Sequence, residues 1–342
     1  MNPISNLISN DTTWPDASAI PGVTLRHTLG ETDWPRMVEI INTGHVVDGL
    51  EEVLSVEEKT NDLRHLEHFD PAADVLCIEV NGLLVAFAKV EWHIDDGGNR
   101  LYHLDTVVHP DFRQLGLLPL LYEFTEMRAR QMAHAQPFDK PQLLSQWVPL
   151  SAQSQIVLLR DLGYAPVRYF YLMQHVLSPI PDVTMPAGLV LWPVDTAKHL
   201  RAIWDAKEEA FADHWGHGPR SEVDFLAWRD NPTAEHALWQ IAWDTASGEI
   251  AGVSMNTIFH ADNAHYGFKR GWIETLGVRR MWRGRGLAKA LLLASMRQMQ
   301  AAGMTEVMLG VDAANPTGAL QLYETMGFRR DKDSAVWRKK IE

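Results

Sequence analysis

Cysteine is almost absent from this 342-residue chain, which contains only Cys77. A single cysteine forms no internal disulfide, and its place in the apolar run 75–80 favours a buried hydrophobic side chain over a nucleophile. No uninterrupted apolar run approaches the roughly 18 residues of a membrane span, and no charged-then-apolar leader opens the chain. We therefore expect a cytoplasmic protein without membrane contact.

Basic residues are outnumbered as well: 31 lysines and arginines stand against 44 aspartates and glutamates, for a formal net charge of −13. Such a surface repels the phosphates of a nucleic acid over most of its area, so we expect no nucleic-acid partner. With 46% hydrophobic and 22% charged residues, the composition is that of a globular protein long enough for two domains. The arginines at 279–285 are a local exception to this negative charge, and their cluster is large enough to bind one small anion.

The stretch from 273 to 290 is the most informative part of the sequence. A strand-like segment ends at Val278, a loop reading Arg-Gly-Arg-Gly ends at Gly286, and an apolar helix begins near Leu287. Glycines let a backbone approach a ligand closely, and the first N–H groups of a helix have no partner within the helix. The arginines add positive charge at the same place. The stretch therefore predicts a site for a pyrophosphate group.

The spacing Arg283-x-x-Gly286-x-Ala288, just after an apolar strand, resembles the coenzyme A motif of the GNAT acetyltransferases. A dinucleotide-binding fingerprint is not met, because Lys289 stands where its third glycine is required. For a bare Gly-x-Gly, a polar turn before a surface helix would be the simpler interpretation. Here the downstream sequence favours the coenzyme site.

The segment 312–328 carries a second motif of the same family. It reads as a loop, a helix and an exit, in which Asn315 can cap the helix, Pro316 fits its first position and Gly327 fits its C-terminal stop. The family's Asn…Leu-Tyr-x-x-x-Gly-Phe signature is matched by Asn315, Leu322, Tyr323, Gly327 and Phe328. The two motifs together cover about residues 270–340.

This resemblance implies an N-acetyltransferase that moves the acetyl group of acetyl-CoA directly to a primary amine of a small molecule or peptide. An ammonium must lose a proton before or during attack, and the departing thiolate must gain one, so the reaction needs a base and an acid. Glu274 is the candidate base, since strand alternation places it on the face of Leu276 and Val278 unless a bulge intervenes. Tyr323 is the candidate acid.

Both candidates have simpler structural interpretations, which the sequence leaves open. Glu274 can be an exposed or ion-paired strand residue. Tyr323 belongs to an apolar helical stripe, which by itself indicates a core position. The members of that stripe are Ala319, Leu322, Tyr323 and Met326.

The resemblance also implies a set of coenzyme-binding residues: Leu276, Gly277, Val278, Arg283, Gly284, Arg285, Gly286, Leu287, Ala288 and Asn315. The amine acceptor is much less visible. His214 and Trp215 lie in a loop where this fold usually shapes its acceptor pocket, although a loop plugged by aromatic side chains is an equal alternative. With Asp213 and His217, this loop lacks a fourth ligand at metal spacing, so we expect no metal site.

The order of expected elements occurs twice along the chain, and Arg113 and Gly116 precede Arg283 and Gly286 by the same 170 residues. Two fused copies of one α/β (α+β) fold explain this repetition best. By the resemblance, each copy is a mixed central sheet flanked by helices. The expected units are an N-terminal GNAT-like domain over 1–178, a proline-rich linker at 179–187 and a C-terminal catalytic GNAT domain over 188–342.

The first copy departs from the family pattern. Its counterpart of Tyr323 is Leu159, its counterpart of Ala288 is Leu118, and Ser151 replaces the capping asparagine. We therefore expect the chemistry in the second copy, while coenzyme binding by the first copy stays open because its arginine and glycine survive. The alternative function is a non-catalytic protein that binds or senses acyl-CoA. The chain can be a monomer or a homodimer.

Overall fold

The computed structural model describes residues 14–341, and within them twelve strands form one continuous sheet. The strands are β1 (Val23–His27), β2 (Val75–Val80), β3 (Leu83–Ile94), β4 (Arg100–Val108), β5 (Gln142–Pro149), β6 (Ala165–Val176), β7 (Leu189–Trp192), β8 (Gln240–Asp244), β9 (Ile250–Thr257), β10 (Arg270–Val278), β11 (Glu306–Asp312) and β12 (Arg329–Lys340). The α-helices are α1 (Trp34–Asp48), α2 (Val56–Arg64), α3 (Pro71–Asp74), α4 (Leu117–Ala135), α5 (Gln153–Asp161), α6 (Thr196–Phe211), α7 (Glu222–Arg229), α8 (His260–Tyr266), α9 (Leu287–Ala301) and α10 (Ala319–Thr325). None of the helices in this part of the chain has the length and apolar composition that crossing a membrane requires.

Local sequence signals account for many of these elements. Asn81 and Gly82 take left-handed φ values of 51° and 80° and close the β2–β3 hairpin, as their sequence predicts. Ser55 Oγ accepts a hydrogen bond from the Glu58 N–H at 3.1 Å, and the Glu58 carboxylate accepts one from the Ser55 N–H at 2.8 Å. This capping box starts α2.

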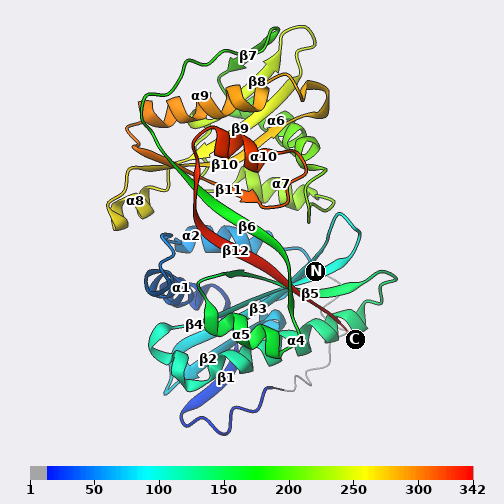
Figure 1. Ribbon diagram of the computed structural model, residues 1–342. Coiled ribbons are helices and arrows are strands. Elements are labelled where there is room, and N and C mark those ends of the chain that lie inside the picture. Colours follow the sequence, from blue (N-terminus) through cyan, green and yellow to red (C-terminus); the bar gives the residue numbers. More distant parts are fainter. Residues whose placement is uncertain (1–13, 342) are drawn as a thin grey trace.

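The sheet has the strand order β1-β2-β3-β4-β5-β12-β6-β11-β10-β9-β8-β7. The first lobe (β1–β5 with α1–α5) lies at one end of the molecule and the second lobe (β7–β11 with α6–α10) at the other, as Figure 1 shows. At the centre, the last strand of each half crosses to the opposite lobe: β12 pairs with β5, and β6 pairs with β11. The strands β6 and β12 also pair with each other.

This exchange of strands shows that the two lobes do not have separate sheets. The strand β6 precedes the linker in the chain, yet it pairs with β11 from Val176↔Glu306 to Phe170↔Asp312. Because the backbone groups of a sheet edge need partners, neither lobe completes its sheet alone. Residues 179–187 lie between the two lobes along the chain, but they do not divide the sheet. The domain boundaries at this point therefore remain a proposal.

Each lobe has helices on both faces of its sheet. In the first lobe, α4 and α5 pack on one face, and α1 and α2 pack on the other. In the second lobe, α9 and α10 pack on one face, and α6 packs on the other. These two-sided cores hold the strand ends that carry the candidate site residues.

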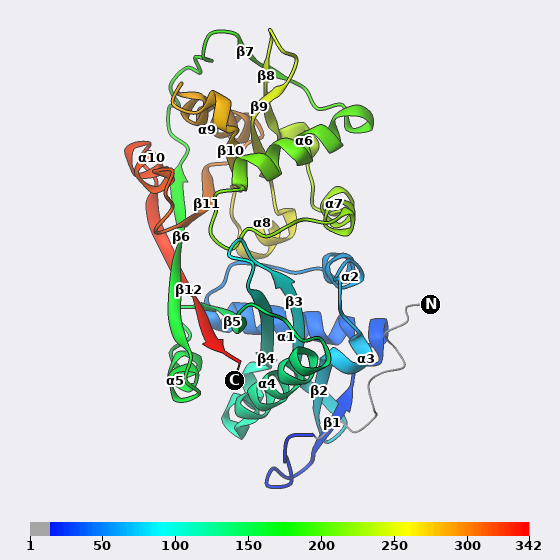
Figure 2. The same ribbon diagram turned by 90° about the vertical axis from the view of Figure 1, so that its right-hand side faces the viewer.

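The lobes also meet along a contact zone that we call the seam, where α2 and residues 50–53 of the first lobe face α7 and α8 of the second (Figure 2). There Tyr266 Oη donates a hydrogen bond to a first-lobe carbonyl at 3.1 Å, and Asn61 Nδ2 donates to a carbonyl of α7 at 3.3 Å. Arg270 forms an ion pair with Glu51 at 2.7 Å. These bonds bring the first lobe close to the start of β10 at Arg270.

Candidate active site

The second lobe opens between β10 and β11. These parallel strands pair only from Arg270↔Glu306 to Trp272↔Met308, although both continue for several residues beyond that point. They diverge after Trp272, so each strand presents an unpaired edge to the other. Unpaired backbone groups of this kind are available to a ligand.

The free edge of β10 is formed by Leu276 and Val278. The N–H of Arg279 donates a hydrogen bond to a carbonyl of the β9 segment at 3.0 Å. Because the backbone groups of a strand alternate in direction, those of Val278 and Leu276 point away from β9. The Val278 carbonyl accepts a hydrogen bond from Arg283, so the Val278 N–H and the backbone groups of Leu276 are the ones left to the opening. Gly277 has a packing role instead, since a Cβ there would lie 2.8 Å from the ring of Phe211 on α6.

The loop before α9 has the backbone that a phosphate site requires. Gly284 and Gly286 have φ values of 74° and 83°, a conformation that is strained for residues with a β-carbon. Gly286 is the N-cap of α9, and the helix begins its hydrogen bonding with the N–H of Ala290 donating to the Gly286 carbonyl at 3.1 Å. The N–H groups of Leu287 and Ala288 therefore lack partners within the helix and favour an anion.

The basic side chains near this loop differ in whether they already have partners within the protein. Arg283 donates hydrogen bonds to carbonyls of β10 and α6, at 3.0 Å each, and pairs with Asp213 at 3.0 Å. Hydrogen bonds from Arg280 and then from Arg283 lower the pKa of the Asp213 carboxyl to about 2. The Arg283 side chain thus ties the loop to α6. Its contribution of charge to the phosphate site stays a prediction. Arg285 and Lys289 form no ion pair within the described residues.

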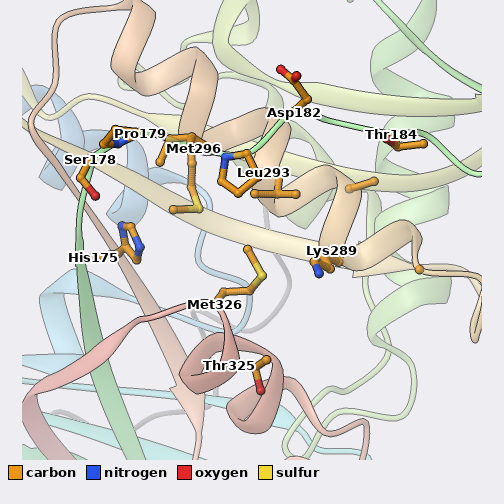
Figure 3. A pocket seen from close by; sticks show the side chains of 14 residues that line it. His175, Ser178, Pro179, Asp182, Thr184, Lys289, Leu293, Met296, Thr325 and Met326 are labelled. Atoms are coloured by element: carbon orange, nitrogen blue, oxygen red, sulfur yellow. The ribbon is translucent and has the colours of Figure 1, made fainter.

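A pocket of about 580 Å³ continues from this loop along α9. It begins at Gly286 and Lys289, passes Leu293 and ends near Met326 after α10, and Figure 3 shows the last three of these side chains around it. Its remaining wall comes from the linker and from His175 on β6. This wall was not expected from the sequence, because it belongs to the first half of the chain.

Glu274 lies at a β-bulge of β10. The strand pairs with β9 as Ile273↔Asn256 and then as Thr275↔Met255, so Glu274 is the extra residue between the two pairs. The interruption that would upset simple strand alternation is therefore present. Because of this extra residue, simple alternation no longer puts the Glu274 side chain on the same face of β10 as Leu276 and Val278.

The environment of Glu274 makes its carboxylate a stronger base. The residue keeps part of its surface exposed to solvent, and its carboxylate accepts a hydrogen bond from Thr257 Oγ1 at 2.8 Å in partly buried surroundings. Desolvation by the surrounding protein raises the pKa of Glu274 and Glu58 of α2 raises it further, while the Thr257 bond opposes both. Sequence reasoning missed Thr257 and Glu58, because the first lies on the neighbouring strand and the second on the other lobe.

Tyr323 is buried in the core of the second lobe, with 7% of its surface exposed. Its ring packs near Phe328, with 5.9 Å between the ring centroids. Desolvation raises the pKa of the Tyr323 hydroxyl to about 12, so this group keeps its proton near neutral pH. The core interpretation of this residue holds, and it is compatible with a hydroxyl that can donate a proton.

Asn315 does not cap α10. That helix begins at Ala319 after Gly318, which has a φ of 77°. The Asn315 Oδ1 instead accepts hydrogen bonds from the N–H and the hydroxyl of Thr317, at 2.7 and 2.6 Å. The cap prediction is wrong because Asn315 and Pro316 form a separate turn before the helix. This turn lies in the loop that follows β11.

The loop with His214 and Trp215 docks against the first lobe and its exchanged strand. The N–H of Gly216 donates to Asp96 Oδ1 at 3.1 Å, and the guanidinium of Arg338 on β12 lies 4.4 Å from the centre of the Trp215 ring. Desolvation lowers the pKa of His214. Within residues 14–341, no three His, Cys, Asp or Glu side chains are grouped as metal ligands.

The first lobe has diverging strands as well, but side chains bridge the gap between them. The strands β4 and β5 part after a short paired segment, and beyond it Gln146 Nε2 donates to Thr106 Oγ1 at 3.2 Å. Gln155 Nε2 donates to Tyr122 Oη at 2.9 Å, which joins α5 to α4. The pairing of β4 with β3 is unbroken, so the first lobe has no bulged counterpart of Glu274.

Replacing Gly286 by valine should lower the affinity for acetyl-CoA by about 10²-fold or more, measured by calorimetry. A β-branched side chain is strained at a φ of 83°, so the loop must abandon the conformation that presents its N–H groups. The matched control is Gly116→Val in the first lobe, where φ is 73° and an added Cβ would also meet no atom within 4 Å. Undiminished affinity in Gly286→Val would place the coenzyme elsewhere.

Wild-type protein should bind about one acetyl-CoA per chain in the same titration. The bridge from Gln146 to Thr106 occupies the first lobe's gap between diverging strands, and Leu118 stands where the second lobe has Ala288. A stoichiometry of about two, or a site that survives in Gly286→Val, would show that the first lobe also takes the coenzyme.

Comparison with known proteins identifies the chain as an acetyl-CoA-dependent N-acetyltransferase of the GNAT type. The chain matches the model of the Acetyltransferase (GNAT) family over residues 200–328. It belongs to this family, so the predicted tandem fold and the predicted enzyme class are confirmed.

Two relatives are mycothiol acetyltransferases, and the tandem layout resembles mycothiol synthase. The relative from Salinispora arenicola is 28% identical over 303 residues, covering 87% of this chain and 91% of its own length. The relative from Acidothermus cellulolyticus is 30% identical over 245 residues, covering 66% of this chain and 67% of its own length. The crystal structure of a GCN5-related N-acetyltransferase from Sphaerobacter thermophilus is similar in fold, with a TM-score of 0.69, 28% identity and coverage of 96% of this chain and 97% of that one.

Proposed function

We propose that this protein transfers the acetyl group of acetyl-CoA directly to a primary amine, and that the second lobe alone carries out the reaction. The supporting observation is that the bulge at Glu274, the open edge of β10 and the loop with two left-handed glycines occur together in the second lobe. The first lobe has an unbroken β4, and side chains bridge its gap.

The proposed position of acetyl-CoA follows from the backbone groups that lack partners. The pyrophosphate lies on the N–H groups between Arg283 and Ala288, with Arg285 and Lys289 nearby. The pantetheine arm enters the opening beside Leu276 and Val278. The pocket beside α9 offers room for the nucleotide end, closed by the linker and His175.

The proposed chemistry needs one proton acceptor and one proton donor. The acceptor amine attacks the thioester carbonyl, and the Glu274 carboxylate takes a proton from the nitrogen, directly or through water. The C–S bond then breaks, and Tyr323 Oη gives a proton to the departing thiolate. The products are an acetamide and free CoA. The raised pKa of Glu274 and the protonated Tyr323 suit these two roles.

The proposed acceptor is a small molecule or a peptide with a primary amine. Because two relatives are named mycothiol acetyltransferases, a mycothiol-related amine is the first acceptor to test. Turnover of acetyl-CoA with that amine and with a broad amine panel tests the proposal. Release of CoA together with an acetylated product supports it, whereas binding of acetyl-CoA without turnover of any amine contradicts it and indicates the sensor function.

A further inference from the structure

The segment between α6 and α7, residues 212–221, contacts both lobes, and we call it the inter-lobe loop. Its first part contacts the loop before α9, residues 279–286, where the pyrophosphate is proposed to lie. Its second part contacts the turn between β3 and β4 of the first lobe, residues 95–99 (Figure 2). Residues 212–221 themselves form no helix or strand, so these contacts determine how the loop lies.

Asp213 joins the inter-lobe loop to the loop before α9. Its carboxylate accepts two hydrogen bonds from the guanidinium of Arg280 and pairs with Arg283 at 3.0 Å. Arg283 also donates to the carbonyls of Ala210 and Val278, at 3.0 Å each. A single exposed ion pair contributes little, but here two arginines of one loop share one carboxylate, and one of them also bonds two backbone carbonyls. A displacement of Asp213 therefore reaches the loop before α9.

Gly218 and Gly216 join the inter-lobe loop to the first lobe. Gly218 is buried, and a Cβ there would lie 1.8 Å from the carbonyl oxygen of Ile94 at the end of β3. That oxygen belongs to a paired strand, so it cannot turn aside as the end of a flexible side chain could. The N–H of Gly216 donates to Asp96 Oδ1 at 3.1 Å. The inter-lobe loop thus lies directly on the backbone of the β3–β4 turn.

The β3–β4 turn is held in place by its own side chains. Asp95 is 3% exposed, and its Oδ1 accepts hydrogen bonds from the N–H and the side-chain amide of Asn99, at 2.8 and 3.1 Å. Asp95 also pairs with Arg338 of the exchanged strand β12 at 3.5 Å. The guanidinium of Arg338 lies 4.4 Å from the centre of the Trp215 ring, so the same arginine contacts both the turn and the inter-lobe loop. The turn is therefore a firm support.

We propose that the β3–β4 turn of the first lobe positions the loop before α9 through the inter-lobe loop, and that Asp96 and Gly218 are positioning residues for acetyl-CoA binding. They act through Asp213 and its two arginines. A binding loop presents its N–H groups in one arrangement only when its supporting contacts are fixed. The inference rests on the proposed function for the identity of the ligand. It gives the first lobe, whose own gap is bridged by side chains, a part in the coenzyme site of the second.

Amide hydrogen exchange of the free protein tests the positioning itself, without any ligand. In Gly218→Ala and in Asp96→Ala, exchange at residues 279–288 should be at least about fivefold faster than in wild type, because the support of the inter-lobe loop is lost. Asp96→Asn keeps an acceptor oxygen and should match wild type. Tyr266→Phe removes a different bond between the lobes and should also leave this exchange unchanged. Unchanged exchange in both test variants, or an equal increase in Tyr266→Phe, would overturn the inference.

Calorimetry with acetyl-CoA tests the consequence for binding. Gly218→Ala should lower the affinity by about tenfold or more and Asp96→Ala by less, whereas Asp96→Asn and Tyr266→Phe should bind as wild type does. A contact that only held the lobes together would lower the unfolding temperature and leave the affinity unchanged. If Gly218→Ala does not fold, Asp96→Ala decides the question.

The same titrations separate this inference from the proposed function. Wild-type affinity in Gly218→Ala and Asp96→Ala, together with lost affinity in Gly286→Val, would overturn the inference and leave the proposed coenzyme site standing. Undiminished affinity in Gly286→Val would instead contradict the coenzyme site. The hydrogen exchange of residues 279–288 would then still decide whether the first lobe positions this loop.

Discussion

Glu274→Gln should lower kcat by about 10² to 10⁴-fold, the range expected when a general base is removed. The substitution keeps the size of the side chain, so acetyl-CoA binding and thermal unfolding should change little. Wild-type kcat/KM should fall as the pH is lowered through the pKa of Glu274, because the carboxylate must be ionised to accept a proton. Since desolvation and Glu58 raise that pKa, this limb should lie above the ordinary range of a glutamate.

Substitutions at two neighbours of Glu274 provide controls, because they should shift its pKa in opposite directions. Glu58→Gln removes a negative charge, so the pKa of Glu274 should fall and the acid limb should move to lower pH; glutamine can still serve in the capping box. Thr257→Val removes the hydrogen bond to the carboxylate, so the limb should move to higher pH. A Glu274→Gln enzyme with wild-type turnover across pH would remove Glu274 from the mechanism.

Tyr323→Phe should lower turnover by about 10²-fold or more if proton donation to the thiolate occurs in the rate-limiting step. The ring remains to fill the core near Phe328, so stability should change far less than activity. Steady-state rates across pH, measured together with thermal unfolding, distinguish the two effects. Wild-type turnover at every pH would show that the hydroxyl has no part in the reaction.

The first lobe offers the matched control for Tyr323. Leu159 occupies the corresponding helical position and is fully buried. Leu159→Met conserves volume, so it should cost less than about 1.5 kcal/mol of stability and leave turnover unchanged. If that variant folds normally but loses turnover, catalysis does not depend on the second lobe alone.

The acceptor side of the site was the least predictable from sequence. His214 and Trp215 were weak candidates, and the structure places Trp215 against Arg338 on the exchanged strand. Glu58 carried no motif at all. Its effect on the pKa of Glu274 comes from the docking of one lobe on the other, which no local pattern reports.

Sequence alone determined the features that depend on short-range chemistry. The turn at Asn81 and Gly82, the capping box of α2 and the glycine loop before α9 are each set by the conformations of a few neighbouring residues. The duplication was also visible, since equal spacing of motifs requires no knowledge of contacts. The asymmetry between Tyr323 and Leu159 could be seen in the same way.

Tertiary structure decided the features that depend on partners distant in sequence. The exchange of β6 and β12 follows from edge strands that find their hydrogen-bond partners in the opposite lobe. The bulge at Glu274 exists only in the register with β9, and its raised pKa depends on Glu58 from the first lobe. The bridge across the first lobe's gap between diverging strands needs Gln146 and Thr106 on two different strands. Pairing register, desolvation and charge proximity are properties of the assembled chain, so composition and spacing could not supply them.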